Sequence, residues 1–119
     1  MQLSEHFDSS EFACHCGCGY KSYGAEVSPR LIEVLEKIRH YLGDIPLEIN
    51  SGVRCPAHNA SEGGVYNSRH VYGDAADIAL PEGLDSTYLA DVAERCGADG
   101  IGVYEWGVHV DMRGYSARW

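Results

Sequence analysis

His70 and Asp77 lie seven positions apart, and the run from 75 to 80 around Asp77 is otherwise apolar. A carboxylate in such a run is costly to bury unless a partner neutralises it. His109 also stands among apolar residues, near the C-terminal end of the sequence. We interpret these three residues as ligands of one metal ion. Two histidines and one carboxylate leave a zinc position open for water, which is the catalytic pattern rather than the closed structural one.

Regular elements must bring these ligands together. The sequence predicts four strands from short apolar or alternating runs bounded by turn residues, over 47–51, 75–80, 100–104 and 107–112. It predicts a helix that begins at Ser28-Pro29 and ends at Gly43, because a capping residue and a proline precede the apolar stripe formed by Leu31, Leu35, Ile38 and Leu42. A second helix is expected to begin at Ser86. Asp77 and His109 would then lie on adjacent strands, with His70 at a strand end.

The order of these elements is helix, strand, strand, helix, strand, strand. It indicates an α+β fold with a small, mainly antiparallel sheet and helices packed on one side. The chain of 119 residues is long enough for one domain with its own core. We therefore expect a single domain over 1–119, in which residues 1–27 form an N-terminal arm with a cysteine-rich loop. A short helical turn is expected just before Phe12.

Composition excludes several classes of partner. Nine Lys and Arg residues stand against eighteen Asp and Glu residues, for a formal charge of −9. That balance disfavours nucleic acid, which binds proteins through basic side chains, and it disfavours anionic membrane surfaces for the same reason. No apolar run approaches the roughly 18 residues of a membrane span. We expect a monomer with no nucleic-acid or membrane partner.

The five cysteines are an odd count, which argues against a fully paired disulfide framework. Cys14, Cys16 and Cys18 fall within five residues, whereas Cys55 and Cys96 stand alone. Their Cys-x-Cys-x-Cys spacing differs from the Cys-x2-Cys pairs of zinc ribbons. Two interpretations stay open: a second metal site, recruiting Cys55, or packed and partly oxidised thiols.

Three motifs combine in one order along the chain: Ser51-Gly52-Val53-Arg54, then Ser68-Arg69-His70 with Asp77 seven positions later, then His109-Val110-Asp111. Together they resemble the zinc D-alanyl-D-alanine carboxypeptidase family. Its superfamily also contains vancomycin-resistance D-alanyl-D-alanine dipeptidases, L-alanyl-D-glutamate endolysins and the hedgehog signalling domain. The resemblance covers residues 28 to 119, and the segment from 100 to the C-terminal Arg118-Trp119 looks most like the murein endopeptidase branch.

The resemblance implies one catalytic zinc ion bound by His70, Asp77 and His109. It implies that Arg54 holds the substrate carboxylate or polarises the scissile carbonyl, a role that suits a permanently charged group with two donors. The implied activity is hydrolysis of a peptidoglycan peptide bond involving D-amino acids, by metal-activated water, as a D,D-carboxypeptidase or a murein endopeptidase. Peptidoglycan peptides are the expected partners.

Further roles follow from the same resemblance. Ser68 and Tyr72 flank the first ligand and would contact substrate, while Asp111 would orient a neighbouring ligand. Related dipeptidases and endolysins carry a glutamate three residues before the last histidine, but that position is Trp106 here. Glu105, one residue earlier, is the candidate general base.

An alternative function remains open at this stage, namely a zinc-stabilised binding module that has kept the fold and lost turnover. Arg54 and the acidic candidate Glu105 favour the enzyme, whereas Trp106 keeps the alternative open. The N-terminal residues lack the basic and apolar stretches of a secretory signal. We therefore expect cytoplasmic synthesis, followed by export or endolysin-like release from the cell to reach the wall.

Overall fold

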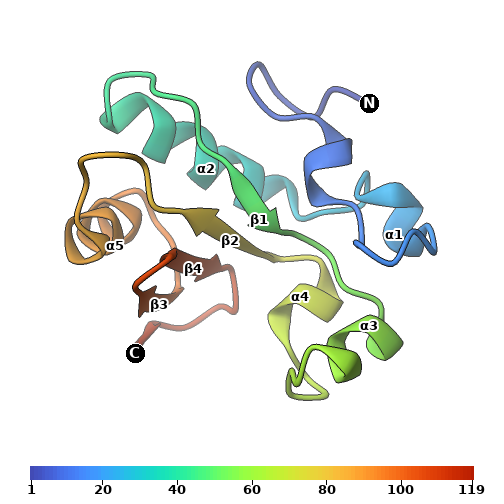
Figure 1. Ribbon diagram of the computed structural model, residues 1–119. Coiled ribbons are helices and arrows are strands. Elements are labelled where there is room, and N and C mark those ends of the chain that lie inside the picture. Colours follow the sequence, from blue (N-terminus) through green and yellow to red (C-terminus); the bar gives the residue numbers. More distant parts are fainter.

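A five-stranded sheet carries its longer helices on one face (Figure 1). The computed structural model describes residues 1–119. Its strands are β1 (Ile49–Ser51), β2 (Ala75–Ala79), β3 (Gly100–Tyr104), β4 (Gly107–Asp111) and β5 (Ala117–Arg118). Its helices are η1 (Ser9–Phe12), α1 (Tyr20–Tyr23), α2 (Pro29–Tyr41), α3 (Pro56–Ser61), α4 (Arg69–Tyr72) and α5 (Ser86–Arg95).

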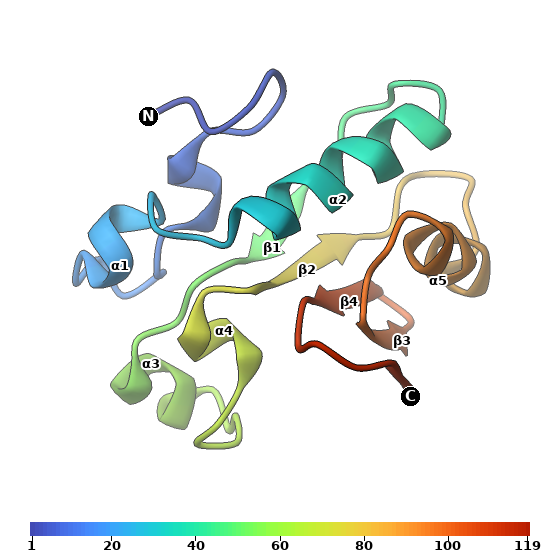
Figure 2. The same cartoon turned by 180° about the vertical axis from the view of Figure 1, so that it is seen from behind.

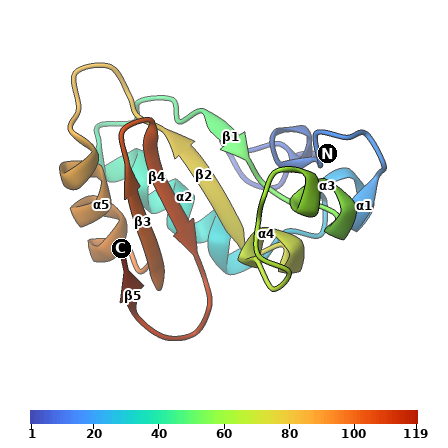
Figure 3. The same ribbon diagram turned by 60° about the horizontal axis from the view of Figure 1, so that its bottom comes forward.

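The strand order is β1-β2-β4-β3-β5, and every pairing is antiparallel except that of β3 with β5. Seen from behind, α2 runs across the sheet and α5 lies beside β3 and β4 (Figure 2). The short helices α3 and α4 lie near the start of β2 instead (Figure 3). The predicted α+β class, with a mainly antiparallel sheet and helices on one side, is confirmed.

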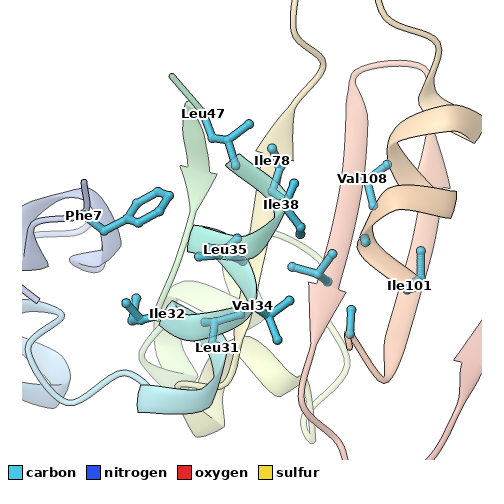
Figure 4. Packing of buried hydrophobic residues seen from close by; sticks show 14 of the residues in the cluster. Phe7, Leu31, Ile32, Val34, Leu35, Ile38, Leu47, Ile78, Ile101 and Val108 are labelled. Carbon is cyan, nitrogen blue, oxygen red and sulfur yellow. The ribbon is translucent and has the colours of Figure 1, made fainter. Parts of the chain in front are cut away.

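Helix α2 forms where its capping signal and apolar stripe predict it. The Ser28 hydroxyl accepts a hydrogen bond from the backbone N–H of Leu31 at 3.3 Å. Leu31, Leu35 and Ile38 are fully buried, and they belong to the same buried cluster as Ile78 of β2 (Figure 4). The core therefore lies between this helix and the sheet.

The pleat of β2 and β4 separates this core from the opposite face of the sheet. Ile78, Val108 and Val110 are fully buried in the core. Successive side chains of a strand point to opposite faces, so Asp77 and His109 point away from the core. The sheet thus presents its polar side chains on the face that the long helices leave free.

The N-terminal arm packs against the segment that follows β1. Asp8 and Glu11 form the capping box of η1, which confirms the expected turn before Phe12. The backbone N–H of Val53 donates to the carbonyl of Phe12 at 2.8 Å. A Cβ on Gly52 would lie 2.5 Å from the Cα of Phe12, so only glycine permits this approach. The arm thereby braces the chain leading to Arg54.

Helix α1, strand β5 and the position of His70 differ from the prediction. His70 lies on the short helix α4 rather than at a strand end, because Ser68 caps a helical turn there and Gly73 ends it with a φ of 78°. Strand β5 was not predicted, since two residues are too few for a periodic pattern. No helix has the length and apolar character needed to cross a membrane.

Candidate metal centre

The register of the sheet places the second and third predicted ligands side by side. Asp77 of β2 pairs directly with His109 of β4. Directly opposed residues of antiparallel strands carry neighbouring side chains on one face. The Nδ1 atom of His109 lies 3.0 Å from Oδ1 of Asp77. Strand pairing thus joins residues that are 32 positions apart.

The first ligand reaches the same carboxylate from α4. Ser68 accepts a hydrogen bond from the backbone N–H of His70 at 3.2 Å, which fixes the start of the helix. The Nε2 atom of His70 lies 3.1 Å from Oδ1 of Asp77. Its other ring nitrogen, Nδ1, lies 2.7 Å from the carbonyl oxygen of Gly52. The three predicted ligands therefore converge on one point.

The partners behind each ring determine its protonation. A carbonyl oxygen and a carboxylate only accept, so Nδ1 of His70 donates to Gly52, and Nε2 of His109 donates to Asp111 at 2.7 Å. In the neutral rings, Nε2 of His70 and Nδ1 of His109 then present lone pairs to the Asp77 carboxylate. Three acceptors can face one another at this distance only when a metal ion or a proton lies between them.

The spacing of these atoms suits zinc. Tetrahedral zinc with bonds of about 2.0–2.1 Å to nitrogen or oxygen separates its ligand atoms by about 3.3 Å. The contacts of 3.0 and 3.1 Å to Asp77 are close to that separation. His70, Asp77 and His109 could all contribute ligand atoms to one ion, and the first two are buried. The donor set therefore fits a divalent cation with an open coordination position.

Asp111 holds His109 in place through a fully buried carboxylate. Arg113 donates to both of its oxygens, at 2.9 and 2.7 Å. Burial alone would raise the pKa of Asp111, but the hydrogen bonds from Arg113 and His109 hold that pKa well below its usual range. Gly100 lies against this pair, and a Cβ there would come 2.3 Å from Oδ1 of Asp111. The carboxylate is thus charged and fixed.

The charge of Asp77 is stabilised in a similar way. Burial would raise the pKa of Asp77, but contacts with His109 and His70 hold it well below its usual range. Burial likewise lowers the pKa of His109, yet Asp111 and Asp77 raise it overall. In the metal-free protein the carboxylates of Asp77 and Asp111 favour a proton on the His109 ring. A bound metal ion would displace this proton.

Arg54 lies at the edge of this centre. Its Nη2 atom lies 3.3 Å from Oδ2 of Asp77, and Nη1 lies 3.4 Å from Oδ1 of Asn59. Its Nε donates to the hydroxyl of Ser51 at 3.2 Å. The guanidinium is thereby anchored on one side while part of it faces the cleft.

A cleft of about 650 Å³ opens over the three ligands, within the size range of small-molecule sites. Its aromatic rim consists of Tyr72, Tyr104, Trp106, Tyr115 and Trp119. The rings of Tyr104 and Trp106 stack at 4.9 Å, and the indole N–H of Trp119 donates to the Tyr104 hydroxyl at 2.8 Å. These flat surfaces are suited to contacting an extended peptide.

The structure brings most of the predicted site residues together. Arg54, Ser68 and Tyr72 line the cleft beside the three ligands, and Asp111 lies directly behind His109. Glu105 is exposed on the turn between β3 and β4 and is not among the residues that line the cleft. Its role as general base, like the substrate roles of the others, stays a prediction.

Sequence reasoning missed Arg113, Tyr104 and Tyr115 as site residues. Arg113 follows Asp111 by two positions, so both side chains can lie on one side of an extended chain. That spacing was the available signal. The two tyrosines gave no signal, because the tertiary fold alone brings them to the cleft.

The comparisons with known proteins agree with this geometry. A family model described as peptidase M15 matches residues 5–112. The chain belongs to the peptidase M15 family. A stretch of 44 residues is 48% identical to the zinc D-Ala-D-Ala carboxypeptidase of Streptomyces albus G; it spans 37% of this chain and only 17% of that protein.

The fold is also similar to that of an endopeptidase of known structure. The Serratia marcescens L-Ala D-Glu endopeptidase ChiX superimposes with a TM-score of 0.53 and 23% sequence identity. The superposition covers 72% of this chain and 80% of that one. At 23% identity this likeness concerns the fold alone.

Proposed function

We propose that this protein is a zinc peptidase that hydrolyses a peptide bond involving a D-amino acid in peptidoglycan. The observation that carries the proposal is the convergence of two imidazole nitrogens on Asp77 at the floor of an open cleft. Membership of the peptidase M15 family supports it, as do the names of the two relatives.

Each residue of the proposed site has a separate role. Zinc held by His70, Asp77 and His109 would supply Lewis acidity, which polarises a carbonyl and makes water nucleophilic near neutral pH. Gly52 and Asp111 hold the two rings in the tautomers that bind a metal. Arg54 is placed beside the centre, where its donors would bind a substrate carboxylate or the negative charge that develops on the carbonyl oxygen.

The proton acceptor is proposed to be Glu105. Its turn joins β3 to β4, the strand that carries His109. Because its side chain is exposed outside the cleft lining, this role requires the turn to move toward bound substrate. Proton acceptors need to come within hydrogen-bond reach only in the substrate complex.

A zinc-stabilised binding module without turnover is the second candidate. The position of Glu105 outside the cleft lining favours it, because the one carboxylate in that lining is Asp77, which is a proposed metal ligand. This candidate shares the metal centre and the cleft but predicts binding without cleavage.

Digestion of purified peptidoglycan tests the proposal. We expect new amino termini with the zinc-loaded protein, and none after treatment with a chelator or with the variant Asp77→Asn, which keeps the shape of the ligand but removes its charge. Mass spectrometry of the products distinguishes loss of a terminal D-alanine from internal cleavage. Binding to peptidoglycan without new termini would establish the non-catalytic alternative.

A further inference from the structure

Four cysteine side chains from two distant segments meet away from the metal centre described above. Cys14, Cys16 and Cys18 lie in the loop between η1 and α1, and Cys55 is the N-cap of α3. That loop lies beside the start of α3 (Figure 3). All four sulfur atoms lie within 4.8 Å of one another.

The distances between the sulfur atoms suit a single metal ion. The Sγ atoms of Cys14 and Cys16 are 3.4 Å apart, and those of Cys16 and Cys55 are 3.7 Å apart. A tetrahedral zinc ion with Zn–S bonds of about 2.3 Å holds its sulfur ligands about 3.8 Å apart. A disulfide would require about 2.0 Å. All four cysteines are free, so the cluster is a compact group of four thiols.

Local backbone geometry builds this group. The carbonyl of Cys14 accepts from the N–H of Gly17 at 3.1 Å, and Gly17 has a φ of 77°, so the loop turns back on itself. The N–H of Cys55 donates to the sulfur of Cys14 at 3.4 Å, and the N–H of His58 donates to the sulfur of Cys55 at 3.3 Å. Hydrogen bonds of this kind recur around metal-bound thiolates because they stabilise the charge on sulfur.

We propose that this group is a closed structural zinc site with four thiolate ligands, Cys14, Cys16, Cys18 and Cys55. Four sulfur ligands leave no coordination position for water, so this ion stabilises structure rather than taking part in catalysis. It is separate from the ion at His70, Asp77 and His109. The remaining cysteine, Cys96, lies at the end of α5 and takes no part.

The position of the cluster gives it a mechanical role. Cys55 follows Arg54 directly, and Gly52, whose carbonyl holds the ring of His70, packs against Phe12. An ion joining Cys14 to Cys55 would therefore fix the segment 52–55, which contains Arg54 and the carbonyl that holds the ring of His70. It attaches the N-terminal arm to this segment at the end opposite the contact with Phe12.

Metal analysis in a background without the first site tests this inference. Asp77→Asn disables the histidine centre, so zinc that remains bound, measured after purification under nitrogen, reports on the thiols. We expect one zinc ion per chain, and X-ray absorption showing a sulfur-only shell at about 2.3 Å. Adding Cys16→Ser and Cys18→Ser should abolish this binding. Adding Cys96→Ser instead is the matched control and should leave it unchanged.

Cobalt provides a measurement that does not depend on native metal content. Co²⁺ added to the metal-free Asp77→Asn protein should produce thiolate-to-cobalt charge-transfer absorption, absent from the Cys16→Ser/Cys18→Ser version and present in the Cys96→Ser version. Because Cys16 and Cys18 are exposed, the protein in which both are replaced should still give the circular dichroism spectrum of a folded protein. The inference is overturned if Asp77→Asn protein binds no metal through sulfur, or if alkylation of protein purified under nitrogen reveals a disulfide among the four. These readouts are independent of peptidase activity, so failure of either proposal leaves the other standing.

Discussion

At the scale of single residues, the protons on two imidazole rings determine what the centre can hold. Gly52 and Asp111 each accept from the far nitrogen of one ring, so the near nitrogens face Asp77 as lone pairs. The sequence allowed His70, Asp77 and His109 to be grouped as candidate ligands, because Asp77 and His109 stand among apolar residues where an unpaired polar group is costly. Arg113 was not predictable as a site residue, because it acts on the site only through the Asp111 carboxylate that it binds.

Asp111→Asn should weaken zinc binding at the histidine centre by roughly 10- to 100-fold, the usual cost of losing a group that orients a metal ligand. The amide keeps the shape of the carboxylate but removes the charge that fixes the ring of His109. Competition with a chromogenic chelator measures the affinity, in a background with Cys16→Ser and Cys18→Ser. Asp91→Asn, an exposed partner of Arg118, is the control. Equal affinities in the two variants would show that Asp111 does not position the ligand.

Arg54→Lys should lower kcat/KM by roughly 100-fold while zinc content stays the same, because lysine keeps the charge but loses the planar fork of donors. Initial rates on a muropeptide with a free carboxyl terminus give the value. Arg118→Lys, which changes an exposed ion pair, should leave the rate unaltered. Full activity of the Arg54→Lys variant would show that the paired guanidinium donors are not needed for catalysis.

Glu105→Gln should lower kcat by roughly 100-fold or more if this carboxylate accepts a proton during catalysis. Zinc content and peptidoglycan binding should not change, since the side chain is exposed and distinct from the ligands. Glu82→Gln on another exposed turn is the control. Full activity of Glu105→Gln would exclude the residue from the mechanism.

At the scale of elements, periodicity explains what could be predicted and what could not. Helix α2 follows from its helical apolar spacing, and the strands β2, β3 and β4 follow from short apolar or alternating runs bounded by turn residues. The register that sets Asp77 opposite His109 depends on long-range pairing, which spacing along the chain does not reveal. Helix α4 is four residues long, too short to show a period, and its only signals were the cap at Ser68 and the glycine that ends it.

Glu36 of α2 holds the N-terminal arm, and its effect on stability should depend on pH. Its carboxylate accepts from the hydroxyl of Ser4 at 2.5 Å and from the backbone N–H of His6 at 2.9 Å. Burial would raise the pKa of Glu36, but the hydrogen bonds from Ser4 and from the ring and backbone N–H of His6 lower it overall. A lowered folded-state pKa means that the stabilisation is present above the unfolded pKa and is lost as pH falls through the folded one.

Glu36→Gln should therefore reduce the free energy of unfolding by about 1–2 kcal/mol at neutral pH. The difference from the native protein should shrink at about pH 3, below the ordinary glutamate pKa of about 4.3. Urea unfolding at both pH values measures it. Glu33→Gln, exposed on the same helix, should have little effect at either pH. A loss of equal size at both pH values would mean that the charge of Glu36 contributes nothing.

At the scale of the whole molecule, the sheet separates an apolar core from a polar site. The face toward α2 and α5 is an apolar core, while the other face carries a polar centre whose groups fix one another. The N-terminal arm connects the two, because Phe7 and Phe12 belong to the core and the following loop reaches Cys55 beside Arg54. The four-cysteine group was left open by the sequence, since its spacing matches no common zinc motif and Cys55 is 39 residues away from Cys16.

The proposed peptidase activity depends on one ion that we propose is held by His70, Asp77 and His109. Diffraction from crystals grown with zinc, measured on both sides of the zinc absorption edge, tests that point most directly. We expect an anomalous peak within about 2.2 Å of Nε2 of His70, a carboxylate oxygen of Asp77 and Nδ1 of His109. A structure in which these atoms bind no zinc, with the rings hydrogen-bonded to Asp77 as imidazolium groups, would contradict it.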